Sequence, residues 1–93
     1  MEGLSEIEAI ISGRVQGVTF RSFVKKKADS LWLKGEVENI PDFKVRVIAQ
    51  GSEEKLEKFI ENLWKGPFDS KVSNVEVFWR DPSGEFKDFK IKY

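Results

Sequence analysis

The hydrophobic pattern of the chain changes twice from strict alternation to a spacing of three and four residues, and this pattern constrains the fold most strongly. Residues 6–12 alternate, with Ile7, Ala9 and Ile11 on one face, which predicts a strand. A helical stripe follows on Phe20, Phe23, Val24, Ala28 and Leu31. The chain therefore starts with a predicted strand and an amphipathic helix, and Gly35 is the predicted helix stop.

The second half of the chain repeats this order of patterns. Residues 36–38 are a predicted short strand, residues 39–42 a turn, and residues 43–49 a strand with alternating apolar side chains. Ser52 is a favourable N-cap for a second helix, which a Gly-Pro pair at residues 66–67 ends. The apolar stripe of that helix consists of Leu56, Phe59, Ile60, Leu63 and Trp64.

Two more strands are predicted near the C-terminus, separated by a turn at residues 81–84. Their alternating apolar positions are Val75, Val77 and Trp79 in the first and Phe89, Ile91 and Tyr93 in the second. Val72 and Phe86 fall out of register with these positions, which predicts bulges or frayed strand starts there.

Strand, helix and strand thus occur twice, followed by a short final strand. Each helix has one apolar stripe and each strand one apolar face, so both helices can be buried on one face of an antiparallel sheet. We therefore predict a ferredoxin-like α/β sandwich, an α+β fold of βαββαβ order with four to five strands. The length favours one domain, residues 1–93.

The composition excludes several classes of function. Sixteen basic residues balance sixteen acidic ones, so no global field attracts nucleic acid or an anionic membrane, and any anion site must be local. The chain has no cysteine and no histidine, which excludes disulfides, the common zinc sites and histidine general bases. No apolar run approaches the roughly 18 residues of a membrane-spanning helix, and the first residues are acidic. A cytoplasmic location is expected, without nucleic acid or membrane as a partner.

The segment GRVQGVTFR, residues 13–21, lies between the first predicted strand and helix. Its glycines can adopt positive φ angles, so a tight loop is expected. A loop that runs into a helix presents unpaired backbone N–H groups, and the helix dipole adds positive charge, so an anion is attracted there. Arg21 is unfavourable at a helix start, and a phosphate held by its guanidinium would compensate. From the pattern alone, an ordinary turn explains the loop equally well, and Lys25 to Lys27 are interpreted as a solvated face.

This segment is similar to the signature of the acylphosphatase family, and it differs from the Walker A and dinucleotide-binding patterns. Further marks of the family follow in the expected order over nearly the whole chain. They are Ala28, Leu31, Leu33, Gly35, Val37, Asn39, Pro41, Asp42, Gly51, Phe59, Leu63, Gly66 and Pro67.

The resemblance implies an enzyme that hydrolyses the carboxyl–phosphate bond of acyl phosphates by direct attack of water, without metal or cofactor. Arg21 and Asn39 are the implied catalytic residues, Arg21 binding the phosphate and the Asn39 amide positioning the water. The phosphate would also be bound by the backbone of five residues, Val15, Gln16, Gly17, Val18 and Thr19. A free phosphate or sulfate ion can occupy the same loop, and the family tendency is a monomer.

The chemistry of acyl phosphates fits this composition independently. The leaving group is a carboxylate, whose conjugate acid has a pKa of about 4, so hydrolysis needs no general acid. Catalysis can then rest on positioning the water and stabilising charge on the phosphoryl oxygens. Asn39 cannot act as a base at neutral pH, and taken alone it is equally typical of an ordinary turn.

The chain departs from the family pattern at three positions. Glu36 stands where the family usually has Trp, and Phe43 follows Asp42 where the hairpin usually has glycine. The missing glycine can change the turn type and shift Asn39. Trp32 replaces the glycine usual at the end of the first helix, which we interpret as a surface or packing change.

Two other functions compete with general acyl phosphate hydrolysis. Related domains act on carbamoyl phosphate within hydrogenase maturation proteins, although those are parts of much longer chains. RNA-recognition modules share the ferredoxin-like topology, but their basic-Gly-aromatic pattern is absent here and the chain has no net positive charge.

Overall fold

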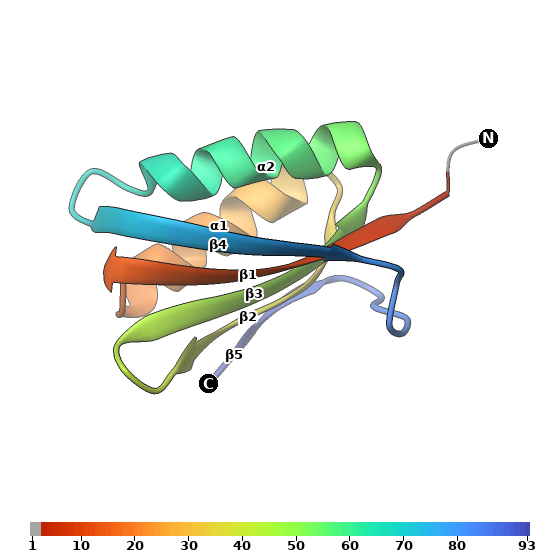
Figure 1. The fold of residues 1–93 in the computed structure, drawn as a ribbon. Coiled ribbons are helices and arrows are strands. Elements are labelled where there is room, and N and C mark those ends of the chain that lie inside the picture. The colour runs from red at the N-terminus through yellow and green to blue at the C-terminus, as the bar shows by residue number, and fades with distance from the viewer. Residues whose placement is uncertain (1–2) are drawn as a thin grey trace.

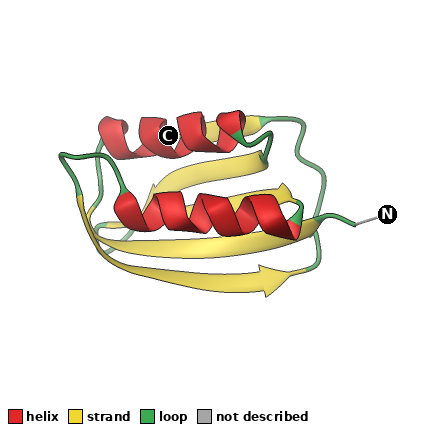
Figure 2. Ribbon diagram, turned by 90° about the horizontal axis from the view of Figure 1, so that it is seen from above, coloured by secondary structure: helices red, strands yellow, loops and turns green. Residues whose placement is uncertain are grey.

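The apolar faces of both helices pack on one side of a single sheet, as the two periodicities require (Figure 1). The computed structural model describes residues 3–93, and these residues form five strands and two helices. The elements are β1 Ser5–Arg14, α1 Val18–Ser30, β2 Lys34–Ile40, β3 Lys44–Gly51, α2 Glu53–Lys65, β4 Lys71–Arg80 and β5 Phe89–Lys92. Figure 2 shows the helices side by side above the sheet.

The strands are ordered β4-β1-β3-β2-β5. Neighbouring strands are antiparallel except for β5, which pairs in parallel with β2. The predicted ferredoxin-like α+β fold is therefore confirmed, with the difference that the short final strand makes the sheet mixed. Because β5 runs in the direction of β2, the C-terminal residues reach the end of the sheet where α1 begins (Figure 1).

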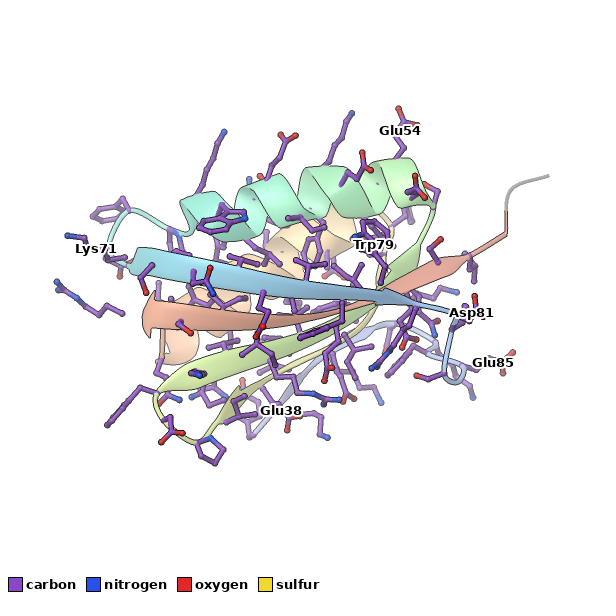
Figure 3. The ribbon with its side chains drawn as sticks, in the orientation of Figure 1. Glu38, Glu54, Lys71, Trp79, Asp81 and Glu85 are labelled. Atoms are coloured by element: carbon purple, nitrogen blue, oxygen red, sulfur yellow. The ribbon has the colours of Figure 1, made fainter. Side chains whose placement is uncertain are left out.

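The core lies between the sheet and the helices. On the strands it is formed by the side chains that the alternation predicted to be buried. Ile7, Ala9 and Ile11 of β1 are fully buried there. The largest buried rings are Phe20, Phe59 and Phe89. The rings of Phe59 and Phe89 pack edge to face, with their centroids 6.2 Å apart. The two tryptophans at the margin of the predicted apolar stripes, Trp64 and Trp79, are half exposed. In Figure 3 Trp79 lies on the α2 side of β4.

Four segments meet at one end of the sheet, which we call the loop end. They are the β1–α1 loop at residues 15–17, the β2–β3 turn at residues 41–43, the α2–β4 connection at residues 66–70, and Tyr93. Figure 1 shows this end on the left, away from the β4–β5 connection at residues 81–88. The topology therefore brings the predicted phosphate loop and the predicted Asn39 turn to the same end.

A bulge interrupts the pairing of β1 with β4 beside Gly13. The register shifts between Ser12 and Gly13, opposite the stretch from Val72 to Asn74, so the irregularity predicted at Val72 is confirmed. Gly13 has a φ of 125°, and a Cβ there would lie 2.1 Å from the carbonyl oxygen of Lys71. Phe86, the other residue predicted out of register, precedes β5 in the β4–β5 connection.

Helix α1 ends earlier than predicted, so the interpretation of Gly35 as the helix stop is wrong. The last helical residue is Ser30, and the amides of Trp32 and Leu33 donate to the carbonyls of Asp29 and Ala28. This is the Schellman pattern, which normally places glycine in the left-handed position. Here Trp32 occupies that position with a φ of 59°. The sequence signal was missed because the usual glycine is a tryptophan, which is a backbone departure and not only a surface change.

Trp32→Gly is expected to stabilise the fold by about 1 kcal/mol, because glycine adopts this left-handed backbone without the Cβ penalty. The Trp32 side chain is 82% exposed, so its removal uncovers little apolar surface. Urea unfolding measures the effect. Trp32→Ala is the matched control, because alanine removes the ring but keeps the Cβ, and it should bring no gain. A Trp32→Gly variant less stable than the parent would contradict this explanation.

Strand β2 is longer than predicted and includes Asn39. Asn39 and Ile40 pair with Val45 and Lys44 of β3, so the predicted turn at residues 39–42 is corrected to residues 41–43. Asp42 and Phe43 have φ angles of 68° and 59°, two successive left-handed residues as in type I′ turns. Phe43 thus keeps a backbone that favours glycine.

The face of the sheet opposite the helices carries paired charges on its central strands. Arg46 of β3 donates to Glu8 of β1 and Glu38 of β2. Glu6 is fully buried under residues 81–88 and accepts hydrogen bonds from Gln50, Arg80 and Ser83. Burial alone would raise the pKa of Glu6, but these hydrogen bonds outweigh burial and lower the pKa from 4.5 to about 2.

Candidate active site

The loop between β1 and α1 consists of residues 15–17, because β1 extends to Arg14 and the helix begins at Val18. Val15 is buried in the core and anchors the loop. Gly17 has φ 118° and ψ 163°, a combination that is essentially restricted to glycine. The positive φ angles predicted for Gly13 and Gly17 are therefore confirmed, and Gly17 turns the chain directly into the helix.

The N-terminus of α1 differs from that of α2 in how its free amides are satisfied. In α2 the Ser52 hydroxyl accepts from the Lys55 amide, and Glu53 and Glu54 complement the dipole. In α1, within the part of the chain that the structure describes, no side chain caps the first turn and no acidic residue lies in it. Val18 and Thr19 are the first two residues of this helix. The first amides of α1 and its partial positive charge are thus available to an anion.

The side chain of Gln16 holds the loop against the β2–β3 hairpin. Its Nε2 donates to the carbonyl oxygens of Ile40 and Lys44, both at 3.1 Å. These carbonyls come from the two strands that flank the turn at residues 41–43. The resemblance assigned the backbone of Gln16 to phosphate binding but gave no role to its side chain, which fixes the loop relative to β2.

Arg21 is the fourth residue of α1 and lies at the end of its first turn, so the helix begins at Val18, three residues earlier than predicted. The residue is 8% exposed. Its Nη1 donates to the carbonyl oxygen of Lys92 at 3.4 Å, and its guanidinium carbon lies 4.9 Å from the centre of the Tyr93 ring. The buried Nε has no hydrogen-bond partner among residues 3–93. Arg21 is therefore a buried cation that retains unused donor capacity at the loop end.

Asn39 lies on the same side of the sheet as Arg21. Strand alternation puts Asn39 on the face of Val37, which is buried beneath the helices. The last paired residues of β2 and β5 are Glu38 and Lys92. The next residue of each strand is Asn39 in β2 and Tyr93 after β5, so these two residues are neighbours just beyond the paired region. No hydrogen bond involves the Asn39 side chain in the described part of the chain. The ordinary turn interpretation of Asn39 does not hold, because the residue belongs to a strand, where asparagine is disfavoured.

Tyr93 contacts Arg21 of the candidate site, and sequence reasoning missed this contact. Its ring stacks on Arg21, yet the sequence supplied only its parity with Phe89 and Ile91, which placed it on the helix face. Its place on the helix face indicated a contact with α1, but it did not identify Arg21 as the residue contacted.

Of the three lysines interpreted as a solvated face, Lys25 is different, because its ammonium donates to Asp29 and to the carbonyl of Phe89.

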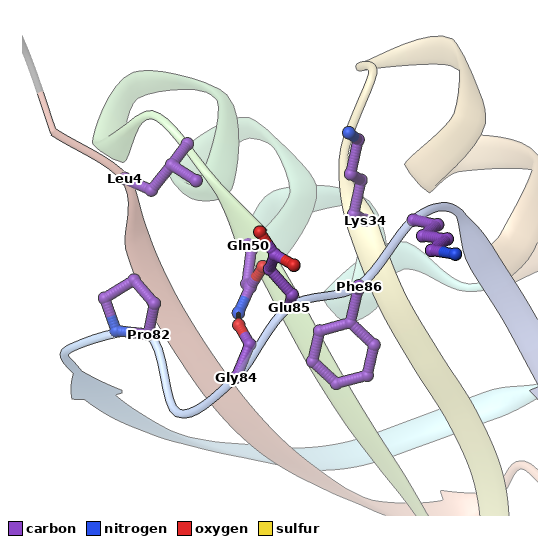
Figure 4. Close-up of a pocket in the computed structure, with 8 residues that line it drawn as sticks. Leu4, Lys34, Gln50, Pro82, Gly84, Glu85 and Phe86 are labelled. Carbon is purple, nitrogen blue, oxygen red and sulfur yellow. Dashed lines mark hydrogen bonds between the residues drawn. The ribbon is translucent and has the colours of Figure 1, made fainter.

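Two cavities are relevant to the choice of site. The larger, about 590 Å³, lies at the end of the sheet opposite the loop end, beneath residues 82–87 (Figure 4). Its polar lining includes the Glu85 carboxylate, and the Gln50 amide there is already bonded to Glu6 and to the Gly84 carbonyl. The second cavity, about 430 Å³, adjoins the loop itself. It is lined by Gly13, Arg14, Val15, Gln16 and Phe43.

Two broader features of residues 3–93 concern metal binding and membrane insertion. No group of three or more acidic side chains in this range lies close enough together to hold a metal ion. Neither helix in the same range has the length and apolar character needed to cross a membrane.

The fold and this end of the sheet define a class of protein: a ferredoxin-like domain with an uncapped helix N-terminus beside a buried arginine. The acylphosphatase family model matches residues 7–91. An acylphosphatase of Thermus thermophilus is 44% identical over 88 residues, which are 95% of this chain and 99% of that protein. The crystal structure of acylphosphatase from Bacillus subtilis superposes with a TM-score of 0.91 at 37% identity, covering 96% of this chain and 99% of that one. The chain therefore belongs to the acylphosphatase family, and the predicted family and enzyme class are confirmed.

A second kind of relative is a domain of a longer protein. The crystal structure of full-length HypF, in its phosphate- and nucleotide-bound form, matches with a TM-score of 0.86 at 33% identity. This match covers all of the present chain but 12% of the HypF chain. The HypF match is consistent with the alternative of a hydrogenase maturation domain, whereas the relatives named acylphosphatase match over nearly their whole length and support the main interpretation better.

Proposed function

We propose that this chain hydrolyses acyl phosphates by attack of water on a phosphoryl group held between the β1–α1 loop, the start of α1 and Arg21. Membership of the acylphosphatase family supports a small-molecule acyl phosphate as the substrate. The observation that carries the site assignment is Arg21, a buried guanidinium with an unpartnered Nε beside an uncapped helix N-terminus. A buried cation without a carboxylate partner is costly unless an anionic ligand shares the site.

In this proposal, the amides of residues 15–19 and the Arg21 guanidinium bind the three phosphoryl oxygens. The oxygen of water bonds to phosphorus while the bond from phosphorus to the bridging oxygen breaks, and the acyl group leaves as a carboxylate. A proton of the water passes to a phosphate oxygen, which gives dihydrogen phosphate. Arg21 and the amides stabilise the charge on the transferring group, and the carboxylate needs no proton to leave.

Asn39 is proposed to orient the attacking water. Its amide can donate to and accept from water, and it stands on a strand whose position relative to the loop is fixed by Gln16. An amide placed by a strand is better ordered than one placed by a flexible turn, and orientation is the contribution that remains when no base is needed.

Asn39→Ala should lower kcat for benzoyl phosphate by roughly one to two orders of magnitude with little change in KM, since water positioning acts in the transition state. Steady-state kinetics measures this split. Asn74→Ala is the matched control, because Asn74 is also an exposed strand asparagine and lies on β4. An unchanged kcat in Asn39→Ala would remove the assigned role of Asn39 and leave that of Arg21 intact.

The open face of the sheet argues against the RNA-binding alternative. RNA-recognition modules stack bases on aromatic side chains of the central strands. Here the corresponding face carries Glu6 and Glu8 on β1 and the paired Arg46 on β3. These carboxylates and Arg46 are already held in ion pairs, so these positions offer RNA neither an aromatic platform nor an unpaired positive charge.

The direct test is to incubate the purified protein with acetyl, benzoyl and carbamoyl phosphate in the presence of a metal chelator. We expect hydrolysis of the first two, competitively inhibited by inorganic phosphate. Hydrolysis of carbamoyl phosphate alone would favour the hydrogenase maturation alternative. A folded protein that hydrolyses none of the three would sink the proposal.

Four further proposals accompany the function. One domain over residues 1–93 fits the single hydrophobic core, a monomer follows the tendency of the acylphosphatase family, and a cytoplasmic location is proposed with them. Binding of free phosphate or sulfate to the loop is proposed on the same grounds as substrate binding. Sedimentation equilibrium tests the monomer, and a phosphate-dependent rise in melting temperature tests the anion site.

A further inference from the structure

Three strongly exposed aromatic residues surround the predicted phosphate loop. Phe43 is 78% exposed, Phe68 101% and Tyr93 92%, and all three lie at the loop end. Tyr93 stacks on Arg21. Of the other two, Phe43 lines the cavity of about 430 Å³ that adjoins the loop. Single exposed aromatics are common on protein surfaces, so the cavity is what distinguishes Phe43.

The backbone at Phe43 is the second observation. A phenylalanine at a φ of 59° is a conformational outlier, since the left-handed region favours glycine, asparagine and aspartate. Such strained positions concentrate at ligand sites. The turn carries this cost at a position where the acylphosphatase signature usually has glycine, so a ring is present here although the backbone disfavours it.

The cavity is also held in a defined shape. One wall is formed by Gly13 to Gln16 of the β1–α1 segment and the other by Phe43 of the turn. The Gln16 side chain joins these walls through its two hydrogen bonds to Ile40 and Lys44. Preformed, largely apolar cavities of several hundred Å³ are suited to small organic groups.

The cavity lies on the side of the loop from which an acyl group would leave. Phosphoryl transfer requires the attacking and leaving oxygens to be roughly in line. Asn39, proposed to hold the water, is on β2 next to β5, whereas Gly13 and Arg14 belong to β1 on the other side of β3. A leaving group opposite the water therefore points towards β1, where Arg14 also offers a positive charge to the departing carboxylate.

We propose that Phe43 is a specificity-determining residue that binds the acyl group of the substrate in this cavity and favours aromatic or bulky apolar acyl phosphates. This inference rests on the proposed function. The ring contacts the acyl group in both the bound substrate and the transition state, so its contribution belongs to KM more than to kcat.

The test compares Phe43→Asn with the parent on benzoyl and acetyl phosphate. Asparagine tolerates the left-handed turn, so the ring is removed with little disturbance of the hairpin. We expect KM for benzoyl phosphate to rise about five- to tenfold, the worth of one aromatic contact, while KM for acetyl phosphate changes less than about twofold. Phe43→Tyr keeps an aromatic ring, so it should retain the preference of the parent for benzoyl over acetyl phosphate. Phe68→Asn, an equally exposed ring that does not line the cavity, should leave both values unchanged.

If the parent is active, two results would overturn the inference about Phe43 and leave the proposed function standing. Equal changes of KM for both substrates in Phe43→Asn would indicate a shifted hairpin, and no change would show that the ring does not meet the acyl group. A parent that hydrolyses neither substrate would instead refute the proposed function, and the inference with it.

Discussion

Replacing Arg21 with alanine is expected to lower kcat/KM for benzoyl phosphate by at least roughly 10² to 10³, the usual cost of losing one transition-state donor. The expected stability change is small, less than about 1 kcal/mol. Arg21 brings a positive charge close to the positive end of α1 and leaves its Nε unpartnered within residues 3–93, so the fold gains little from it. A large loss of activity with an unchanged melting temperature is the signature of a residue kept for its ligand.

Two further variants make this result specific. Lys27→Ala removes another cation from α1, one that also lies near a ring, that of Phe23 at 5.6 Å, and it should change kcat/KM less than about twofold. Arg21→Lys keeps the charge but loses the two parallel donors, so its activity should fall between those of the parent and the alanine variant. Phosphate should raise the melting temperature of the parent and not that of Arg21→Ala. Full activity in Arg21→Ala would refute the site assignment.

Glu6→Gln is expected to destabilise the fold by about 3 kcal/mol at pH 7, the free-energy equivalent of the pKa shift of Glu6 from 4.5 to about 2. Glu6 accepts hydrogen bonds on both carboxylate oxygens. A glutamine would direct an amide N–H at one of these donors, and Arg80 cannot accept a hydrogen bond. The effect should also loosen residues 81–88, which Glu6 holds through Ser83.

The pH dependence has a definite sign. The pKa of Glu6 is lower in the folded than in the unfolded chain, so its stabilisation is complete above pH 4.5 and is lost as the pH falls from 4.5 towards 2. Urea unfolding of parent and variant between pH 7 and pH 2 should therefore show a difference that shrinks over that window. Glu57→Gln, at an exposed position of α2, should show a difference close to zero throughout. A pH-independent difference for Glu6→Gln would contradict the role of its charge.

Much of the fold could be predicted from periodicity alone. Each buried face repeats with the period of its element, so the period identifies the buried residues. Examples are the alternation on Ile7, Ala9 and Ile11 of β1 and the helical stripe on Leu56, Phe59 and Leu63 of α2, all of which are buried. The end of α1 could not be predicted in this way. Its Schellman turn depends on the backbone angle of Trp32, and a tryptophan gives no local signal for a left-handed residue.

The candidate site was predictable where the motif is local and not where it depends on tertiary contacts. Residues 13–21 carry their glycines and Arg21 in one segment, so the loop and its arginine could be assigned together. The contacts of Gln16 with the hairpin and of Arg21 with Tyr93 join residues more than 20 and 70 positions apart. Such contacts are set by the strand order, which places β5 beside β2 and brings the last residue of the chain to α1.

The central claim is that water attacks phosphorus in the site of Arg21. The most direct measurement is hydrolysis of benzoyl phosphate in water labelled with oxygen-18, followed by mass analysis of both products. We predict that the label enters inorganic phosphate and that benzoate remains unlabelled, because the bond from phosphorus to the bridging oxygen is the one that breaks. Label in benzoate, which requires attack at the carbonyl carbon, would contradict the mechanism.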